Sequence, residues 1–123
     1  MKTLQECADI IAKHFLNQRE ICRKPYLNLV IGPCLFLDED TGNKCAFVVL
    51  IPKEKYSPAF EGHSLDELCV HYVNFLDSLD LPSDAVATEF FCEAQSIHDD
   101  CWDRRNEKFK KLCDKNSLQY NPN

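Results

Sequence analysis

Cysteine and histidine residues in the last third of the chain have a spacing that could bind a metal ion. Cys92, His98 and Cys101 fall within one segment that is expected to be helical, where His98 and Cys101 lie about one turn apart. Two such side chains make half of a tetrahedral zinc site. Structural zinc sites commonly contain cysteines roughly two to four residues apart, and this chain has no such pair. We therefore interpret these thiols as core residues, keep a zinc site as the alternative, and expect no cofactor.

A cysteine nucleophile would need a positively charged environment and a histidine base. Cys34 follows the dipeptide Gly32–Pro33, whose turn could present the thiol, but the acidic run Asp38–Asp40 comes soon after it. The chain has no phosphate-binding glycine loop, no GxSxG nucleophile motif and no zinc-deaminase signature. These observations favour a protein without catalytic activity of its own.

The eight cysteines are more consistent with reduced thiols than with a disulfide framework. Glu6 and Asp9 interrupt the N-terminal segment, where a secretory signal would need an unbroken apolar stretch. Cys7 and Cys45 occupy positions where a small apolar residue is expected, and free cysteine is among the most buried residue types. No apolar run approaches the length of about 18–20 residues that spans a membrane. The sequence therefore predicts a cytoplasmic protein with free thiols and no membrane contact.

Acidic side chains are concentrated in the middle of the chain. The 123 residues carry 20 acids and 14 bases, which gives a net charge of -6 at pH 7. Residues 64–100 contain nine acids and no lysine or arginine, whereas both ends of the chain are basic. Such a surface attracts basic partners and repels nucleic acid. The residues expected to form this acidic docking face are Asp66, Asp77, Asp80, Asp84, Glu89, Glu93, Asp99 and Asp100.

A smaller basic patch follows the acidic segment, with Trp102 and Phe109 placed among its bases. On one helix these bases would spread over more than one face, which favours a solvated helix end over a nucleic-acid-binding surface. We therefore expect no direct contact with nucleic acid. The residues of this secondary basic patch are Arg104, Arg105, Lys108 and Lys111.

The periodicity of the apolar residues predicts three helices. Thr3 and Glu6 form a capping box at the start of the first helix, and the second helix begins in the same way. The third helix extends back to residue 84, with Ser83 as its cap, unless residues 84–91 form a strand, since that segment fits both structures. The three helices are expected over residues 3–17, 64–79 and 84–115 or 92–115.

The sequence of residues 27–51 predicts an antiparallel hairpin or meander between the first two helices. Alternating apolar residues come first, a turn rich in Asp, Gly and Asn follows, and Cys45–Ile51 is a continuous apolar run typical of a strand buried on both faces. The predicted fold class is therefore α+β, with a short antiparallel sheet covered by three helices. We expect one compact domain over residues 1–123, with a frayed tail at 116–123. The open edges of so small a sheet would allow a homodimer.

Three functional hypotheses follow. The first is a non-enzymatic inhibitor, immunity-like, anti-defence-like or adaptor protein, whose acidic face docks onto a basic nuclease, toxin or nucleic-acid-handling complex. The second is a small enzyme or ligand-binding protein that works through cysteine, histidine or zinc. The third is an escort protein, because the size, acidity and helix–hairpin–helix order are similar to those of the small acidic dimeric chaperones of bacterial secretion systems.

Overall fold

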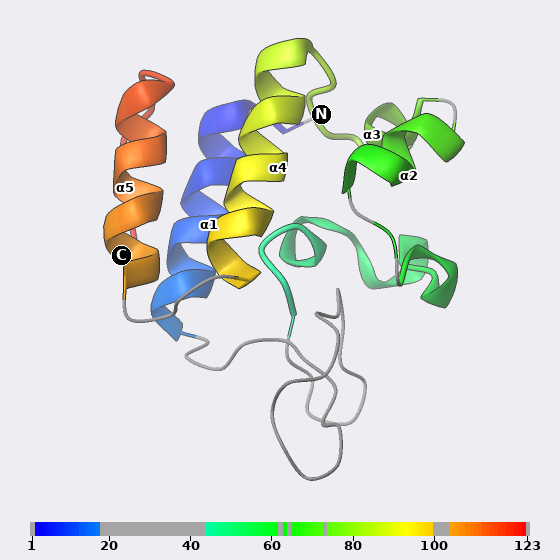
Figure 1. Ribbon diagram of the computed structural model, residues 1–123, viewed down its shortest axis with the longest axis horizontal. Helices are drawn as coiled ribbons and strands as arrows, with labels where there is room; N and C mark the ends of the chain where they lie inside the picture. Colours follow the sequence, from blue (N-terminus) through cyan, green and yellow to red (C-terminus); the bar gives the residue numbers. More distant parts are fainter. Residues whose placement is uncertain are drawn as a thin grey trace, which may run out of the picture.

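The computed structural model describes residues 2–17, 44–61, 63, 65–72, 74–99 and 104–122. These residues are mostly helical and contain no β-strand. The three longest helices lie side by side (Figure 1): α1 (Leu4–Asn17), α4 (Ala85–Asp99) and α5 (Arg105–Lys115). The remaining elements lie on the other side of α4: α2 (Leu65–His71), α3 (Phe75–Ser78) and the single-turn 3₁₀ helices η1 (Val48–Leu50), η2 (Lys53–Lys55) and η3 (Pro58–Phe60).

Helix α1 forms as its sequence predicts. The Glu6 N–H donates to the Thr3 hydroxyl oxygen at 3.1 Å, and the Thr3 N–H donates to the Glu6 carboxylate at 3.2 Å. This reciprocal pair satisfies backbone donors that the first turn of a helix leaves open. Cys7, Ile11 and Phe15 form part of one apolar stripe, and all three are buried against the rest of the molecule. The capping box and the stripe therefore fix both the start and the packed face of α1.

The segment 84–91, which fits both strand and helix as a sequence, is helical and forms the first half of α4. Its cap is Asp84, whose Oδ1 accepts a hydrogen bond from the Ala87 N–H at 2.7 Å. The predicted cap, Ser83, instead donates its hydroxyl to Asp77 Oδ1 at 2.7 Å. An aspartate at this position also places negative charge at the positive end of the helix dipole.

The predicted third helix is two helices that pack against each other. Helix α4 ends at Asp99 and α5 begins at Arg105. The predicted second helix, over residues 64–79, is likewise divided into α2 and α3. Asn74 precedes α3 in the left-handed conformation, with φ 55° and ψ 39°, which asparagine tolerates better than most residues do. Each interruption lets a shorter helix change direction.

The predicted central strand is wrong. Cys45–Ile51 forms a turn followed by η1, with the Leu50 N–H donating to the Phe47 carbonyl at 3.0 Å and the Ile51 N–H donating to the Val48 carbonyl at 2.9 Å. These local bonds satisfy the backbone as a sheet partner would, and the apolar side chains pack into the core. The expected partner strand lies outside the described residues. The α+β prediction is therefore replaced by a helical structure for the part of the chain that is described.

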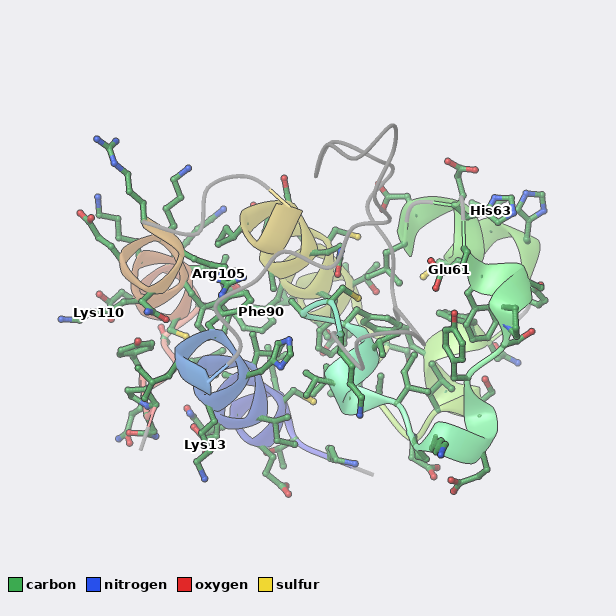
Figure 2. All side chains as sticks on the ribbon, turned by 90° about the horizontal axis from the view of Figure 1, so that it is seen from below. Lys13, Glu61, His63, Phe90, Arg105 and Lys110 are labelled. Carbon is green, nitrogen blue, oxygen red and sulfur yellow. The ribbon has the colours of Figure 1, made fainter. Side chains whose placement is uncertain are left out.

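Seven phenylalanine rings form a continuous chain of contacts through the core. In order of contact they are Phe60, Phe75, Phe47, Phe91, Phe90, Phe109 and Phe15, with centroids of successive rings 5.2 to 6.0 Å apart. Phe90 and Phe91 are consecutive in α4 and each is 1% exposed. Phe90 points into the space between α1, α4 and α5 (Figure 2), whereas Phe91 contacts Phe47 beside η1. Helix α4 is therefore buried on two sides and joins the two halves of the core.

The residues after α5 return along α1. The Gln119 N–H donates to Gln5 Oε1 at 2.9 Å, and Gln5 Nε2 donates to the Gln119 carbonyl at 3.0 Å. Asn121 Nδ2 donates to Asp9 Oδ1 at 3.1 Å, and the Tyr120 ring packs against the core. These contacts hold part of the tail against α1. The frayed tail and the single-domain organisation both stay predictions.

Candidate functional site

The predicted acidic face divides into two groups. The side chains of Asp99 and Asp100 lie outside the described ones. Asp66, on α2, and Glu89 and Glu93, on α4, line one groove. The other three described acids lie around α3 and the start of α4: Asp77, Asp80 and Asp84. The two groups differ in what their carboxylates already bind.

The α2–α4 groove runs along α4 beside α2, is open to solvent and has a volume of about 550 Å³. Most of its surface is made of apolar atoms, and its carboxylates come from two different helices. None of the described residues that line it is a lysine or an arginine. The lining residues are Asp66, Ala85, Thr88, Glu89, Cys92, Glu93 and Ser96. Acids that are more than 20 residues apart in the sequence therefore meet at one concave surface.

Cys92 is a hydrogen-bond donor in this groove. Its Sγ lies 3.1 Å from Asp66 Oδ1, so the thiol donates to the carboxylate. Burial, with a contribution from Asp66, raises the pKa of Cys92 to about 12. Burial also raises the pKa of Cys69. Since the thiolate is the reactive and metal-binding form, neither residue has the properties of a nucleophile.

The alternative zinc site is not assembled in the described residues. Cys101 lies outside them, as does the side chain of His98, and the thiol of Cys92 is bonded to Asp66. Within the described ranges, no group of three or more His, Cys, Asp or Glu side chains is arranged to hold a metal ion. Four described cysteines are free thiols: Cys7, Cys69, Cys92 and Cys113. Cys45 Sγ accepts a hydrogen bond from the Val48 N–H at 3.3 Å.

Glu93 forms an ion pair with a basic residue from the end of α5. Lys115 Nζ lies 3.1 Å from Glu93 Oε1, and both side chains are partly exposed, at 62% and 37%. The hydrogen bond and the charge of Glu93 raise the pKa of Lys115. The rim of the groove therefore already receives one cation from the chain itself.

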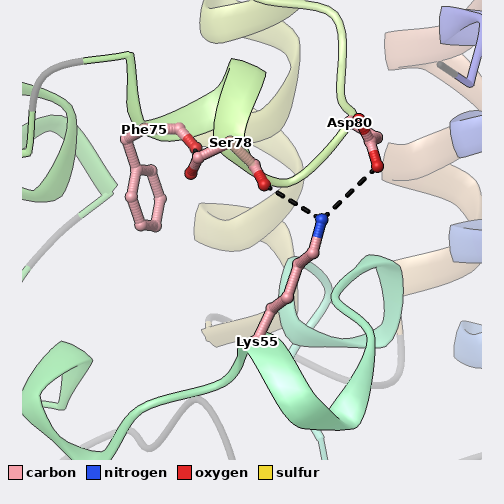
Figure 3. A network of polar contacts seen from close by, with 4 residues as sticks. All are labelled: Lys55, Phe75, Ser78 and Asp80. Carbon is pink, nitrogen blue, oxygen red and sulfur yellow. Dashed lines mark hydrogen bonds and ion pairs between the residues drawn. The ribbon is translucent and has the colours of Figure 1, made fainter.

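The second group of acids holds local structure together. Asp84 caps α4, and Asp77 accepts the hydroxyl of Ser83. Asp80 pairs with Lys55, whose Nζ lies 3.4 Å from Asp80 Oδ2 and donates to the Ser78 carbonyl at 3.1 Å (Figure 3). These carboxylates are used in capping and in tying η2 to the end of α3. Half of the described acidic face therefore has a structural role that sequence composition does not indicate.

The secondary basic patch loses one of its predicted members. Arg105 is 1% exposed, and its guanidinium carbon lies 5.0 Å from the centroid of the Phe15 ring. Its Nη2 donates to the Phe15 carbonyl at 3.5 Å, and burial lowers its pKa. Figure 2 shows Arg105 inside the molecule, whereas Lys110 points outward from α5. Arg104, Lys108 and Lys111 remain, and their spacing of four and three residues places these three along one face.

A second concavity, of about 500 Å³, was not predicted from the sequence. Phe60, Tyr72 and Phe75 are in mutual ring contact there, with centroids 5.3 to 5.9 Å apart. Lys55 and His71 also line it. These residues come from η2, η3, α2 and α3, so their proximity depends on the interruption between α2 and α3, which the sequence pattern did not predict.

No protein family, curated protein or solved structure that we compared with this chain matches it. Among the described residues, none of the helices combines the length and the apolar character that crossing a membrane requires. The described part also contains no strand, so the element order behind the similarity to secretion chaperones is absent there. The sheet edges that suggested a homodimer are absent from it for the same reason.

Proposed function

We propose that this protein is a non-enzymatic, cytoplasmic binding protein that docks its α2–α4 groove onto a basic surface of a partner protein. A nuclease, a toxin or a nucleic-acid-handling complex would offer such a surface, because these proteins bind phosphate through clustered lysine and arginine. The observation that supports the proposal most is the meeting of Asp66, Glu89 and Glu93 at one groove without a basic lining residue among those described.

The exposed apolar residues beside these acids support a binding role. Val86 is 56% exposed and lies one turn before Glu89 on α4, while Val70 is 82% exposed and lies one turn after Asp66 on α2. Apolar contacts supply much of the affinity of an interface, whereas complementary charge speeds association and selects the partner. Each wall helix therefore carries an acid for recognition next to an apolar side chain that a partner would bury.

The test compares two double variants with the same change in charge. Asp66→Asn/Glu89→Gln removes two charges of the groove, whereas Glu54→Gln/Asp114→Asn neutralises two exposed acids outside it. Each variant is immobilised and used to capture proteins from the source cell at low and at high salt. We expect the groove variant to lose the salt-sensitive partner and the control variant to retain it, with unchanged circular dichroism in both. Equal capture by both variants would refute the proposal.

A further inference from the structure

The geometry points to an arginine side chain of the partner as the group that the α2–α4 groove binds, with Lys115 as an intramolecular competitor at its rim. This inference rests on the proposed function and names its ligand chemistry. An arginine needs an apolar surface for its methylenes and carboxylates placed so that its guanidinium can bond to more than one of them.

The groove offers an apolar surface next to separated carboxylates. Ala85, Thr88 and Cys92 present methyl, methylene and thiol groups, against which the three methylenes of an arginine can lie. Asp66 and Glu89 approach from two different helices. A guanidinium has five N–H donors in one plane and is more weakly hydrated than an ammonium, so it can bond to two carboxylates at once beside apolar groups. Lysine has one compact charge and fits such a divided acceptor set less well.

The hydrogen bond between Cys92 and Asp66 also favours an arginine as the ligand. The Cys92 thiol donates to one of its oxygens, which fixes the orientation of the carboxylate. The thiol stays neutral because burial raises its pKa to about 12, so it neither competes as an anion nor removes the charge of Asp66. Asp66 is therefore an oriented anion in the groove.

Lys115 shows that this rim accepts a cation. Its Nζ lies 3.1 Å from Glu93 Oε1, and it reaches Glu93 from the end of a neighbouring helix. A partner's cation would have to displace Lys115 from Glu93 or share that carboxylate with it. Removing Lys115 should therefore strengthen binding at the groove by on the order of twofold to fivefold, the range of one exposed ion pair.

The first measurement uses two short fluorescein-labelled peptides of equal length and charge, one of arginine and one of lysine, with the full chain. We expect the arginine peptide to bind more tightly in fluorescence anisotropy. We expect Asp66→Asn/Glu89→Gln, but not the control Glu54→Gln/Asp114→Asn, to remove the difference. If both peptides bind equally and both depend on the groove acids, the inference is wrong while the proposed function survives. If neither peptide depends on those acids, both fail.

The second measurement tests Lys115 with a matched control. Lys115→Gln and Lys111→Gln remove the same charge from the same helix, but Lys111 pairs with Glu107 at 3.7 Å and does not contact the groove acids. We expect Lys115→Gln to tighten binding of the arginine peptide more than Lys111→Gln does. Equal effects would mean that only the net charge matters, and Lys115 would not be a competitor. Urea unfolding of both variants verifies that each remains folded.

Discussion

Removal of the Phe109 ring should produce one of the largest losses of stability that a single substitution can cause in this chain. Phe109 is 0% exposed and lies on α5. Its centroid is 5.2 Å from that of Phe15 in an edge-to-face contact, 5.8 Å from that of Phe90 and 6.4 Å from that of Tyr120. One side chain therefore joins α5 to α1, to α4 and to the returning tail.

The expected magnitude follows from these contacts. Burying a phenylalanine side chain contributes about 2–3 kcal/mol, and a favourable aromatic pair adds about 0.5–1.5 kcal/mol. Phe109→Ala loses both and leaves a cavity among rigid rings, so we expect a loss of about 3–5 kcal/mol in the free energy of unfolding. Phe109→Leu keeps most of the volume and should cost roughly 1–2 kcal/mol.

Urea unfolding followed by far-ultraviolet circular dichroism measures both values. The control is Val86→Ala on α4, where the side chain is 56% exposed and the expected change is within about 0.5 kcal/mol. A lower midpoint with an unchanged slope would assign the loss to the native core. If Phe109→Ala destabilised the protein no more than Val86→Ala does, the packing of α5 against α1 and α4 would be wrong.

Three further predictions concern a helix cap and the dependence of stability on pH. Asp84→Ala should cost about 1 kcal/mol in urea unfolding because it removes the cap of α4, and Ser83→Ala should cost less; the reverse order would restore Ser83 as the cap. Burial lowers the pKa of His14 below 6.5, so on acidification the unfolded chain takes up the proton first, and the free energy of unfolding should fall as the pH drops below about 6.5. His14→Gln should make that fall shallower in urea unfolding at several pH values, and an unchanged slope would contradict the prediction. Burial raises the pKa of Cys7 and of Cys113 from 9.0 to about 11, so the unfolded chain loses these protons first, and stability should decline as the pH rises from 9 to about 11. Thermal melts of Cys7→Ala/Cys113→Ala should show a shallower decline over that range, and an equally steep one would refute the role of these two thiols.

Local signals in the sequence predicted α1 correctly because that helix is specified by its own residues. Thr3 and Glu6 complete each other's hydrogen bonds within one turn, and the apolar stripe has a single period. Neither feature requires knowledge of the rest of the fold. The apolar periodicity also predicted helix over much of residues 84–115. It did not predict the break before Arg105, because no proline or glycine marks that break.

The central strand was predicted wrongly because an unbroken apolar run has no period. Cys45–Ile51 is rich in β-branched residues and almost wholly buried, and burial alone does not distinguish a strand from a turn with a short 3₁₀ helix. The ambiguity of residues 84–91 had another cause, since Val86, Thr88 and Phe90 recur at every second position, as in a strand. In the structure the segment is helical, and Phe90 and Phe91 are both buried because α4 has core on two sides.

The candidate site depends on a distinction that composition cannot make. The acidic segment predicted one docking face, but a carboxylate that caps a helix contributes to folding, whereas one at an open groove is available to a partner. Asp84 and Asp66 represent these two cases: the first accepts a backbone N–H at 2.7 Å, and the second is exposed and oriented by a thiol. Neutralising Asp84 should therefore lower stability without changing the binding of a basic peptide to the folded protein. Neutralising Asp66 should weaken the binding of that peptide and leave stability unchanged. Charge counts locate the segment, and the hydrogen-bond partners of each acid decide which of its members can act on another molecule.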